Sequence, residues 1–273
     1  MTFTPWTALA LAALGLVVGA FGTLIGAGGG FVLTPILLLL YPHGPPKTVT
    51  AISLAVVFAN ACSGSAAYAR QRRIDYRSGL VFAAATLPGS VLAAVAVAHV
   101  SRRAFEALMA GVLLLLGTWL LAGARARRAR PSRGRERVIV DLAGQTYRYR
   151  VSLLRGALYS LGVGFVSTFL GIGGGVMHVP LLARALGFPV HVATATSHFV
   201  LAIMAGAATI THAVQGSFAV GDGLRRALAL AAGVVVGAQL GAHLSLRLAG
   251  HAIERLLGLA LVALALRFLV AVA

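Results

Sequence analysis

At 273 residues, 59% hydrophobic and only 11% charged, with a mean hydropathy of +0.91, the chain is not a soluble protein, because a soluble domain carries about 25% charged residues. Its formal net charge of +17 does not indicate a nucleic-acid partner. The basic residues lie in short segments between apolar runs, where they mark the cytoplasmic side of a membrane protein. The single cysteine, Cys62, excludes an intrachain disulfide and a multi-cysteine metal site, and we expect its side chain to be buried.

Ten apolar runs follow one another along the chain, and each is predicted to be a helix. They cover approximately residues 6–25, 31–41, 48–69, 79–99, 104–123, 152–170, 175–187, 191–213, 224–246 and 252–272. Each long run can cross about 30 Å of hydrocarbon, and only a helix bonds its backbone amides within its own segment. The runs at 31–41 and 175–187 are too short to cross alone. The predicted fold class is therefore an all-α polytopic membrane protein of about eight helices, or ten with the short half-helices.

An internal repeat relates two parts of the chain. The segment GAGGGFVLTP (Gly26–Pro35) matches GIGGGVMHVP (Gly171–Pro180) at an offset of 145, and four glycines and the proline coincide. A second match at an offset of 144 pairs Ser53 with Ser197. Offsets that drift so little along the chain indicate a duplication, so we predict two homologous halves.

A polar stretch separates the first membrane repeat, residues 1–123, from the second, residues 151–273. Ten of the 23 basic residues lie between Arg125 and Arg155, so we expect the linker at 124–150 to be cytoplasmic. Alternating apolar residues on either side of Ala143-Gly144 predict a small β-hairpin in this linker. A disordered linker is the alternative.

The direction of the two repeats is open. If the basic loops at 70–77, 124–155 and 214–226 are all cytoplasmic, each half crosses an even number of times and the repeats are parallel. If the short run in each half completes a second crossing, each half has five elements and the repeats are inverted. Transporters use both arrangements. The basic residues favour the even count.

The glycine cluster in each half predicts a break in a membrane helix. Glycine costs about 1 kcal/mol in a helix relative to alanine, and Pro35 and Pro180 follow each cluster. Backbone outside a helix persists in hydrocarbon only where protein or a watery cavity surrounds it. The first amides of a restarting helix carry partial positive charge and bind anions. The expected donors belong to Gly28, Gly29, Gly30, Gly173, Gly174 and Gly175, with tight helix packing as the alternative role.

These paired motifs, with TAIS following the first and TATSH following the second, resemble those of the sulfite exporter group, the TauE/SafE family of membrane permeases. The resemblance covers nearly the whole chain, including the basic central loop. It implies a permease of the bacterial inner membrane for sulfite, organosulfonates or related sulfur-containing anions. It does not select one of these anions or the direction of transport.

Polar side chains after the breaks are candidates to complete an anion site. Hydroxyl, amide and protonated imidazole groups donate hydrogen bonds to oxyanions, and the candidates are Ser53, Asn60, Ser197 and His198. The alternative for each serine is a hydrogen bond to a carbonyl of its own helix.

Ionisable residues within the apolar runs are candidates for proton coupling. His178, His198 and His212 lie in the second half, and histidine titrates near neutrality. A neutral, packed histidine is the alternative for each. Glu106 and Glu254 occupy equivalent repeat positions, where we expect them to cap a helix or to pair with a neighbouring arginine.

The sequence therefore favours a secondary transporter that binds a small anion, moves it across the bilayer by alternating access and needs no cofactor or metal. A passive anion channel is the close alternative. An intramembrane enzyme would need an activated serine with a histidine base. Ser63 and Ser65 offer serines, but their run contains no histidine. A membrane scaffold would have no use for paired helix breaks.

Overall fold

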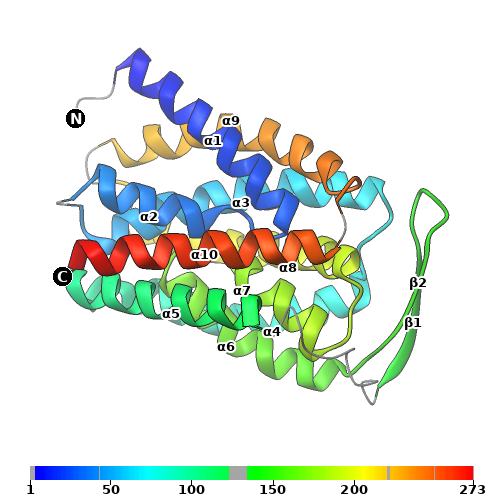
Figure 1. Ribbon diagram of the computed structural model, residues 1–273. Coiled ribbons are helices and arrows are strands. Elements are labelled where there is room, and N and C mark those ends of the chain that lie inside the picture. The colour runs from blue at the N-terminus through cyan, green and yellow to red at the C-terminus, as the bar shows by residue number, and fades with distance from the viewer. Residues whose placement is uncertain (1–3, 43, 123–133, 220–221, 249, 273) are drawn as a thin grey trace.

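The computed structural model describes the chain apart from residues 1–3, 43, 123–133, 220–221, 249 and 273. The described residues form ten α-helices and one β-hairpin (Figure 1). The first half contains α1 (Pro5–Ile25), α2 (Gly30–Leu40), α3 (Pro46–Arg70), α4 (Tyr76–Ala96) and α5 (Arg102–Ala122). The hairpin strands are β1 (Arg135–Val140) and β2 (Thr146–Val151). The second half contains α6 (Leu153–Phe169), α7 (Gly175–Pro180), α8 (Val190–Val214), α9 (Gly223–Leu244) and α10 (Gly250–Val272).

The helices confirm the predicted fold class. Each apolar run became a helix whose ends lie within a few residues of the predicted bounds, except that α7 ends early, at Pro180, and a π-helical turn continues it. The count of ten includes the short elements α2 and α7. Among the described residues, α1, α3, α4, α5, α8 and α9 are long and apolar enough to cross a membrane. The antiparallel strands β1 and β2 confirm the predicted hairpin. Cys62 was expected to be buried, but it is exposed on the outer face of α3.

Glycines bring α1 and α9 into close contact. A Cβ atom on Gly19 would lie 2.7 Å from the carbonyl oxygen of Val234, and one on Gly15 would collide with the backbone of Leu230. The contacts advance in the same direction along both helices, so α1 and α9 run parallel. Small residues at such interfaces allow membrane helices to approach closely.

The helices α4 and α6 pack in the same manner. A Cβ on Gly89 of α4 would lie 2.6 Å from the carbonyl oxygen of Leu161, and Gly156 of α6 packs on Phe82. These two helices are also parallel. The helices α3 and α8 cross at the centre of the bundle in opposite directions, since Gly64 packs on His198 whereas Gly206 packs on Phe58.

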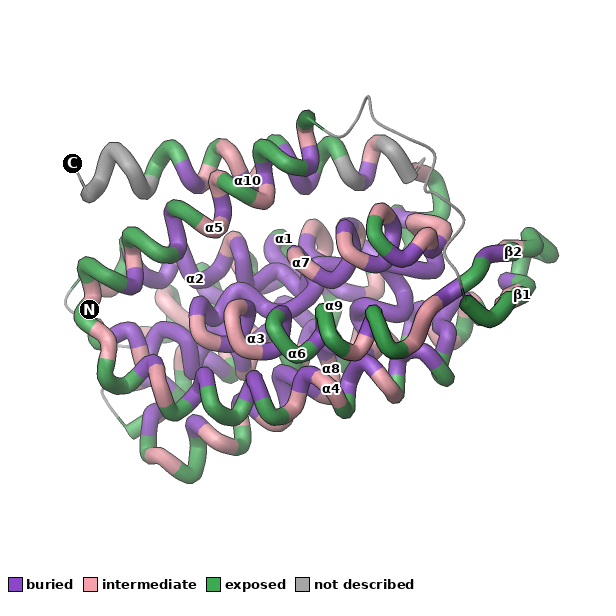
Figure 2. Tube along the Cα trace, turned by 90° about the horizontal axis from the view of Figure 1, so that it is seen from below, coloured by how far each residue is buried: buried purple, intermediate pink, exposed green. Residues whose placement is uncertain are grey.

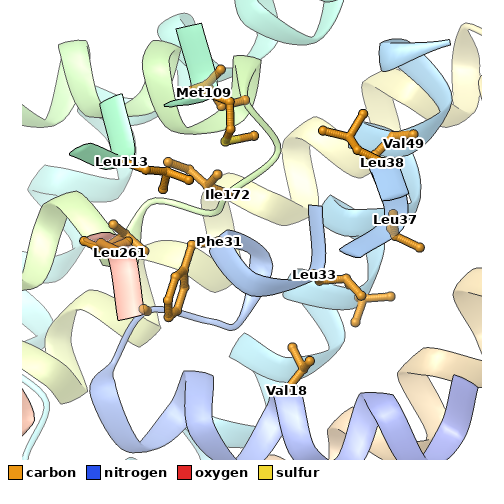
Figure 3. Packing of buried hydrophobic residues seen from close by; sticks show 14 of the residues in the cluster. Val18, Phe31, Leu33, Leu37, Leu38, Val49, Met109, Leu113, Ile172 and Leu261 are labelled. Atoms are coloured by element: carbon orange, nitrogen blue, oxygen red, sulfur yellow. The ribbon is translucent and has the colours of Figure 1, made fainter. Parts of the chain in front are cut away.

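The helix α2 turns back beside α1. Gly29 lies against Val18 of α1, and α2 then runs to Leu40, close to the start of α3. In the other half α7 follows α6 and continues into a π-helical turn, Leu181–Ala185. Figure 3 shows α2 side chains such as Phe31 packed among residues of α1, α5 and α10. Buried residues fill the interior, whereas α5 and α10 carry exposed residues on their outward faces (Figure 2).

The hairpin lies at one end of the bundle, and α1 begins and α10 ends at the other (Figure 1). Arg73, just after α3, pairs with Asp141 of the hairpin. At the opposite end of α3, Lys47 Nζ donates a hydrogen bond to the carbonyl oxygen of Gln215 at 3.1 Å. The loops at 70–77 and 214–226 therefore lie at opposite ends of the bundle.

The prediction that the basic loops share one side, which favoured an even count of crossings, is wrong. The two arginines expected in the loop after α8 lie in the first turn of α9 and have partners close by. Arg225 lies 3.5 Å from Asp222, and the guanidinium of Arg226 lies 4.1 Å from the ring centroid of Tyr41. Charge that is engaged locally in this way is a poor marker of the cytoplasmic side.

Candidate functional site

Both glycine clusters break a helix, as predicted. The helix α1 ends because Gly26 adopts a left-handed φ of 82°. Gly28 and Gly29 follow at 76° and 79° before α2 begins. Between α6 and α7, Gly171 and Gly173 have φ values of 65° and 75°. Glycine reaches these left-handed conformations without the steric penalty of a side chain, which explains why the breaks need it.

The two breaks lie directly against each other. A Cβ on Gly30 would lie 2.7 Å from the carbonyl oxygen of Ile172. The contact is reciprocal, since a Cβ on Gly175 would collide with the carbonyl oxygen of Gly26 and would lie 2.5 Å from the Cα of Ala27. The first residue of α2 therefore packs on the loop before α7, and the first residue of α7 packs on the loop before α2.

The paired breaks are enclosed where α3 and α8 cross. Gly28 and Gly173 both lie against Val57 of α3 and Leu201 of α8. All residues from 25 to 31 and from 170 to 176 are buried. The breaks therefore face protein rather than lipid, which is one of the two settings in which irregular backbone persists at membrane depth.

The start of α2 presents backbone donors without acceptors. The N–H groups of Ala27 and Gly28 donate to the carbonyl oxygen of Gly22 at 2.8 and 3.1 Å. Those of Gly30 and Phe31, like that of Gly29, have no hydrogen-bond acceptor among the described residues. A helix start with free N–H groups carries partial positive charge.

The start of α7 has the same property. The N–H of Gly171 donates to the carbonyl oxygen of Thr168 at 3.0 Å, and that of Ile172 donates to Ser167 at 3.1 Å. Within the described part of the chain, no acceptor is present for the N–H groups of Gly173, Gly174, Gly175 and Val176. The predicted glycine amides are thus available as donors in both halves, with the exception of Gly28.

Serine and threonine hydroxyls hold the loop carbonyls. Ser53 Oγ and Thr34 Oγ1 each lie 2.7 Å from the carbonyl oxygen of Gly171. Ser197 Oγ donates to the carbonyl oxygen of Gly26 at 3.4 Å. Each predicted serine therefore reaches the break of the other half instead of a carbonyl of its own helix. In this conformation both hydroxyls position the loops rather than point at open space.

A buried polar cluster joins the first break to α3 and α8. Thr23 Oγ1 donates to Asn60 Oδ1 at 2.9 Å and lies 3.2 Å from His198 Nε2. The hydroxyl of Tyr68 donates to the carbonyl oxygen of Thr23 at 2.7 Å. Asn60 Nδ2 and His198 Nδ1 have no partner among the residues that the structure describes. A buried polar atom without a partner costs about 1–3 kcal/mol, so these two atoms are candidates to contact a ligand.

His178 lies at the second break. Its Nδ1 lies 3.3 Å from the position of a Cβ on Gly174, and the sulfur of Met204 lies at the same distance from that position. His178 Nε2 is 3.0 Å from Ser160 Oγ. His178 Nδ1, and Thr168 Oγ1 near the end of α6, are buried without partners in the described part of the molecule.

The remaining predicted residues lie away from the breaks. His212 is near the end of α8, where its Nδ1 lies 3.2 Å from Ser217 Oγ, so the structure does not bring it to the site. Pro35 lies inside α2, and Pro180 is the last residue of α7. Neither proline therefore stands at the break itself, although each follows it closely.

Of the two glutamates, Glu106 has the predicted arginine partner. Its Oε1 accepts a hydrogen bond from Arg102 Nε at 2.7 Å. The same guanidinium donates to the carbonyl oxygens at the end of α2 and just after it, those of Leu38, Tyr41 and Gly44. Arg102 thus caps the returning half-helix. The side chain of Glu254 lies outside the described residues.

Three threonines at the breaks, Thr23, Thr34 and Thr168, were not predicted from the sequence. Thr23 and Thr168 stand three residues before Gly26 and Gly171, at the same offset of 145 as the motifs. Extending the repeat alignment by one helical turn would have found them. Thr34 gives no such signal, because a valine occupies the equivalent position in the second half.

The geometry defines a class of protein. Helices of membrane length enclose two facing helix breaks whose amides lack acceptors, an arrangement that secondary transporters place at their substrate sites. Ser63, one of the serines considered for an enzyme, donates to the carbonyl oxygen of Val235 at 2.7 Å. Within the described part of the chain, its hydrogen-bond partners do not include a histidine. The molecule is a polytopic helical membrane protein of the transporter class.

Comparison with known proteins assigns the family. Residues 11–268 match the family described as Sulfite exporter TauE/SafE, and the chain belongs to this family. It is 30% identical to the probable membrane transporter protein YunE of Bacillus subtilis (strain 168), over 92% of this chain and 93% of that protein. It is 26% identical to a probable membrane transporter protein of Xylella fastidiosa (strain 9a5c), over 92% and 90%. A probable membrane transporter protein of Methanocaldococcus jannaschii is 27% identical over 67% of this chain and 64% of its own.

No solved structure matches the chain. The family and the names of these relatives indicate a membrane transporter rather than an enzyme. The family assignment expected from the paired glycine motifs is confirmed.

Proposed function

We propose that the protein is a secondary transporter that carries a small sulfur-containing anion, such as sulfite or an organosulfonate, and binds it at the paired glycine breaks. The observation that carries this proposal is the pair of helix starts with unpartnered N–H groups that meet at the buried centre. Free amides at helix starts bind anions without a basic side chain. The family description, which names sulfite, supports the choice of anion.

The anion would contact backbone N–H groups of both halves. Gly29 and Gly30 would supply donors from one side, and Gly174 and Gly175 from the other. Asn60 Nδ2 would add a side-chain donor. Because the breaks are buried from every direction in this conformation, we assign it to an occluded state, and the halves must move apart for the anion to enter or leave.

Helix directions support an inverted repeat of residues 1–123 and 151–273. The helix α1 is parallel to α9, and α6 is parallel to α4. The helix α3 is also parallel to α9, since Ser63 bonds to Val235 and Gln71 bonds to Ala242. Because α4 returns in the opposite direction to α3, α1 and α6 point in opposite directions. Inverted repeats of this kind allow two equivalent conformations that are open to opposite sides.

The basic linker at 124–150 supports a cytoplasmic location for the hairpin end, in the inner membrane of a bacterium. Ten of the 23 basic residues lie between Arg125 and Arg155, and an excess of arginine in short loops marks the cytoplasmic side. The loop at 214–226 then lies on the opposite side.

Flux measurements in proteoliposomes test the proposal. Sulfite, sulfoacetate, thiosulfate and sulfate are offered in turn, and saturable flux of at least one sulfur oxyanion is expected, together with counterflow of labelled substrate. Flux without counterflow would show a passive channel. Lack of flux for all four anions with correctly inserted protein would refute the transport of sulfur anions.

A matched pair of variants tests the site itself. Gly174→Leu should abolish flux while the protein remains inserted, because the side chain would project among His178, Met204 and the free amides. Gly162→Leu is the control, since a Cβ there meets nothing within 4 Å. Equal flux in the two variants would reject the breaks as the binding site.

Proton coupling through the buried histidines is tested separately. We expect His198→Gln, and to a lesser degree His178→Gln, to remove the dependence of flux on a pH gradient, because both imidazoles have an unpartnered nitrogen near a break. His212→Gln should retain that dependence, because this residue lies at the end of α8. If His198→Gln retains it as well, the histidine is a packing residue.

A further inference from the structure

The β-hairpin is attached to the helices by buried polar contacts that the proposed anion site does not use. Arg73 donates to Asp141 Oδ2 through Nε at 3.1 Å and Nη2 at 2.9 Å. Asp141 Oδ1 accepts backbone N–H bonds from Ala143 and Gln145 within the turn. The side chains of this ion pair are 8% and 2% exposed. The hairpin is therefore docked in a fixed position on the end of α3.

A second contact joins the hairpin to the turn between α3 and α4. The hydroxyl of Tyr149 in β2 donates to Asp75 Oδ2 at 2.9 Å. The Asp75 carboxylate also accepts the N–H and the hydroxyl of Ser78, at 3.1 and 2.6 Å, and Arg137 Nε lies 3.8 Å away. Burial, followed by the charge of Asp75, raises the pKa of the Tyr149 hydroxyl. The hydroxyl therefore remains a donor throughout the physiological pH range.

Tyr149 also touches the second half of the chain. Its ring centroid lies 4.6 Å from that of Phe188, in the segment that leads from α7 into α8. Phe188 in turn packs on Phe82 of α4, with centroids 6.4 Å apart. One hairpin side chain thus contacts elements of both halves at the same end of the bundle.

The contact continues from Asp75 toward the first glycine break. The N–H of Asp75 donates to Thr196 Oγ1 in α8 at 3.0 Å. The residue after Thr196 is Ser197, which bonds to the carbonyl oxygen of Gly26. Thr194 lies about half a helical turn before Thr196, and its Cα and Cγ2 atoms pack against Gly26. The beginning of α8 is therefore held on one face by the α3–α4 turn and on the next face by the break.

We infer that Tyr149, Asp75 and Thr196 form a latch through which the hairpin keeps the first glycine break closed to the hairpin side. Release of the Tyr149 hydroxyl from Asp75 frees the α3–α4 turn, and the beginning of α8 can then move away from Gly26. Tyr149 acts here as a positioning residue, since it does not touch the breaks. The inference rests on the proposed function for its purpose, but the latch itself can be measured without any substrate.

Thiol labelling from the hairpin side tests the latch. In a Cys62→Ser background, Thr194→Cys places one thiol beside Gly26, at a position that is 1% exposed as threonine. The probe is a membrane-impermeant maleimide, applied to proteoliposomes of known orientation. Loss of a hydrogen bond to a charged acceptor corresponds to about a tenfold change in an equilibrium. Tyr149→Phe should therefore raise the labelling rate by about tenfold.

Tyr147→Phe is the matched control. Tyr147 lies two residues away on the same strand, and its hydroxyl reaches Asp141 of the hairpin itself, at 3.3 Å. Its labelling rate should stay within about twofold of the parent protein. Equal rates in Tyr149→Phe and Tyr147→Phe would overturn the latch, because general loosening of the hairpin would then explain both.

A second variant breaks the latch from its other end. Thr196→Val keeps the shape of the side chain and removes the acceptor for the Asp75 N–H, so it should also raise the labelling rate severalfold. It provides the test if Tyr149→Phe fails to fold, and an unchanged rate in Thr196→Val would overturn the proposal. If the parent protein shows no anion flux but the two latch variants label faster than their parent, the proposed function is rejected and the latch is supported.

Discussion

Gly175→Ala isolates the contact between the two breaks. The backbone φ of Gly175 is not left-handed, so alanine is tolerated conformationally and the perturbation is steric. The new Cβ would collide with the carbonyl oxygen of Gly26 and would lie 2.5 and 2.8 Å from the Cα and C atoms of Ala27. All of these are backbone atoms, so relief requires the two loops to separate by about 1 Å. Overpacking of this kind costs about 1–3 kcal/mol.

The assay combines thermal unfolding with flux. For a chain of this size about 2 kcal/mol corresponds to a fall of roughly 4–8 °C in Tm, and we expect flux to fall at least tenfold, because displacement of binding groups by 1 Å is costly. Gly174→Ala should be milder, since its nearest neighbour is the flexible end of Met204 at 3.0 Å. Gly162→Ala, which meets nothing within 4 Å, is the control. Equal Tm and flux in Gly175→Ala and Gly162→Ala would show that the breaks do not depend on close contact.

Three further predictions concern stability. Arg102→Lys should lower Tm by more than the same change at its exposed neighbour Arg103, because lysine cannot bond three carbonyl oxygens and a carboxylate at once. Thr34→Val should cost about 1 kcal/mol in thermal unfolding by removing one hydrogen bond to Gly171, and no loss would contradict that bond. Burial opposes ionisation of Asp141, but hydrogen bonds from the neighbouring guanidinium and two backbone amides outweigh it and hold its pKa below the ordinary value. Hairpin docking should therefore be complete above the ordinary aspartate pKa and be lost as pH falls through the lowered one. Hydrogen-exchange protection of β2 that stays constant through full acid titration of the carboxylates would contradict this.

Much of the fold could be predicted from the sequence, because hydrocarbon leaves few structures open to an apolar run. The helix bounds and both breaks followed from run length and from glycine clusters such as Gly28–Gly30. The hairpin followed from alternation around Gly144, which adopts a left-handed φ of 80° in the turn. These features can be predicted because each depends on residues that are consecutive or close together in the sequence.

Contacts between distant segments could not be predicted in the same way. The sequence does not indicate that Asp75 contacts Thr196 or Tyr149, because these residues lie far apart along the chain. The hairpin also has no counterpart in the repeat that could have pointed to the contact. The placement of the loop at 214–226 was wrong for a similar reason. Arg225 and Arg226 suggested the cytoplasmic side, whereas in the structure they lie in the first turn of α9, where Arg225 pairs with Asp222 and Arg226 stacks on Tyr41.

The unpartnered polar atoms favour ligand binding over tight packing as the proposed role of the glycines. If the glycines served packing alone, apolar side chains around them would stabilise the fold better. Asn60 Nδ2, Thr168 Oγ1, His178 Nδ1 and His198 Nδ1 are instead buried beside the breaks without partners in the described part of the chain, at about 1–3 kcal/mol each. Leu54 and Leu33 occupy the repeat positions equivalent to His198 and His178, so the same fold accommodates apolar residues at those places. A polar ligand that bonds to these atoms would offset their free-energy penalty, and packing alone offers no such compensation.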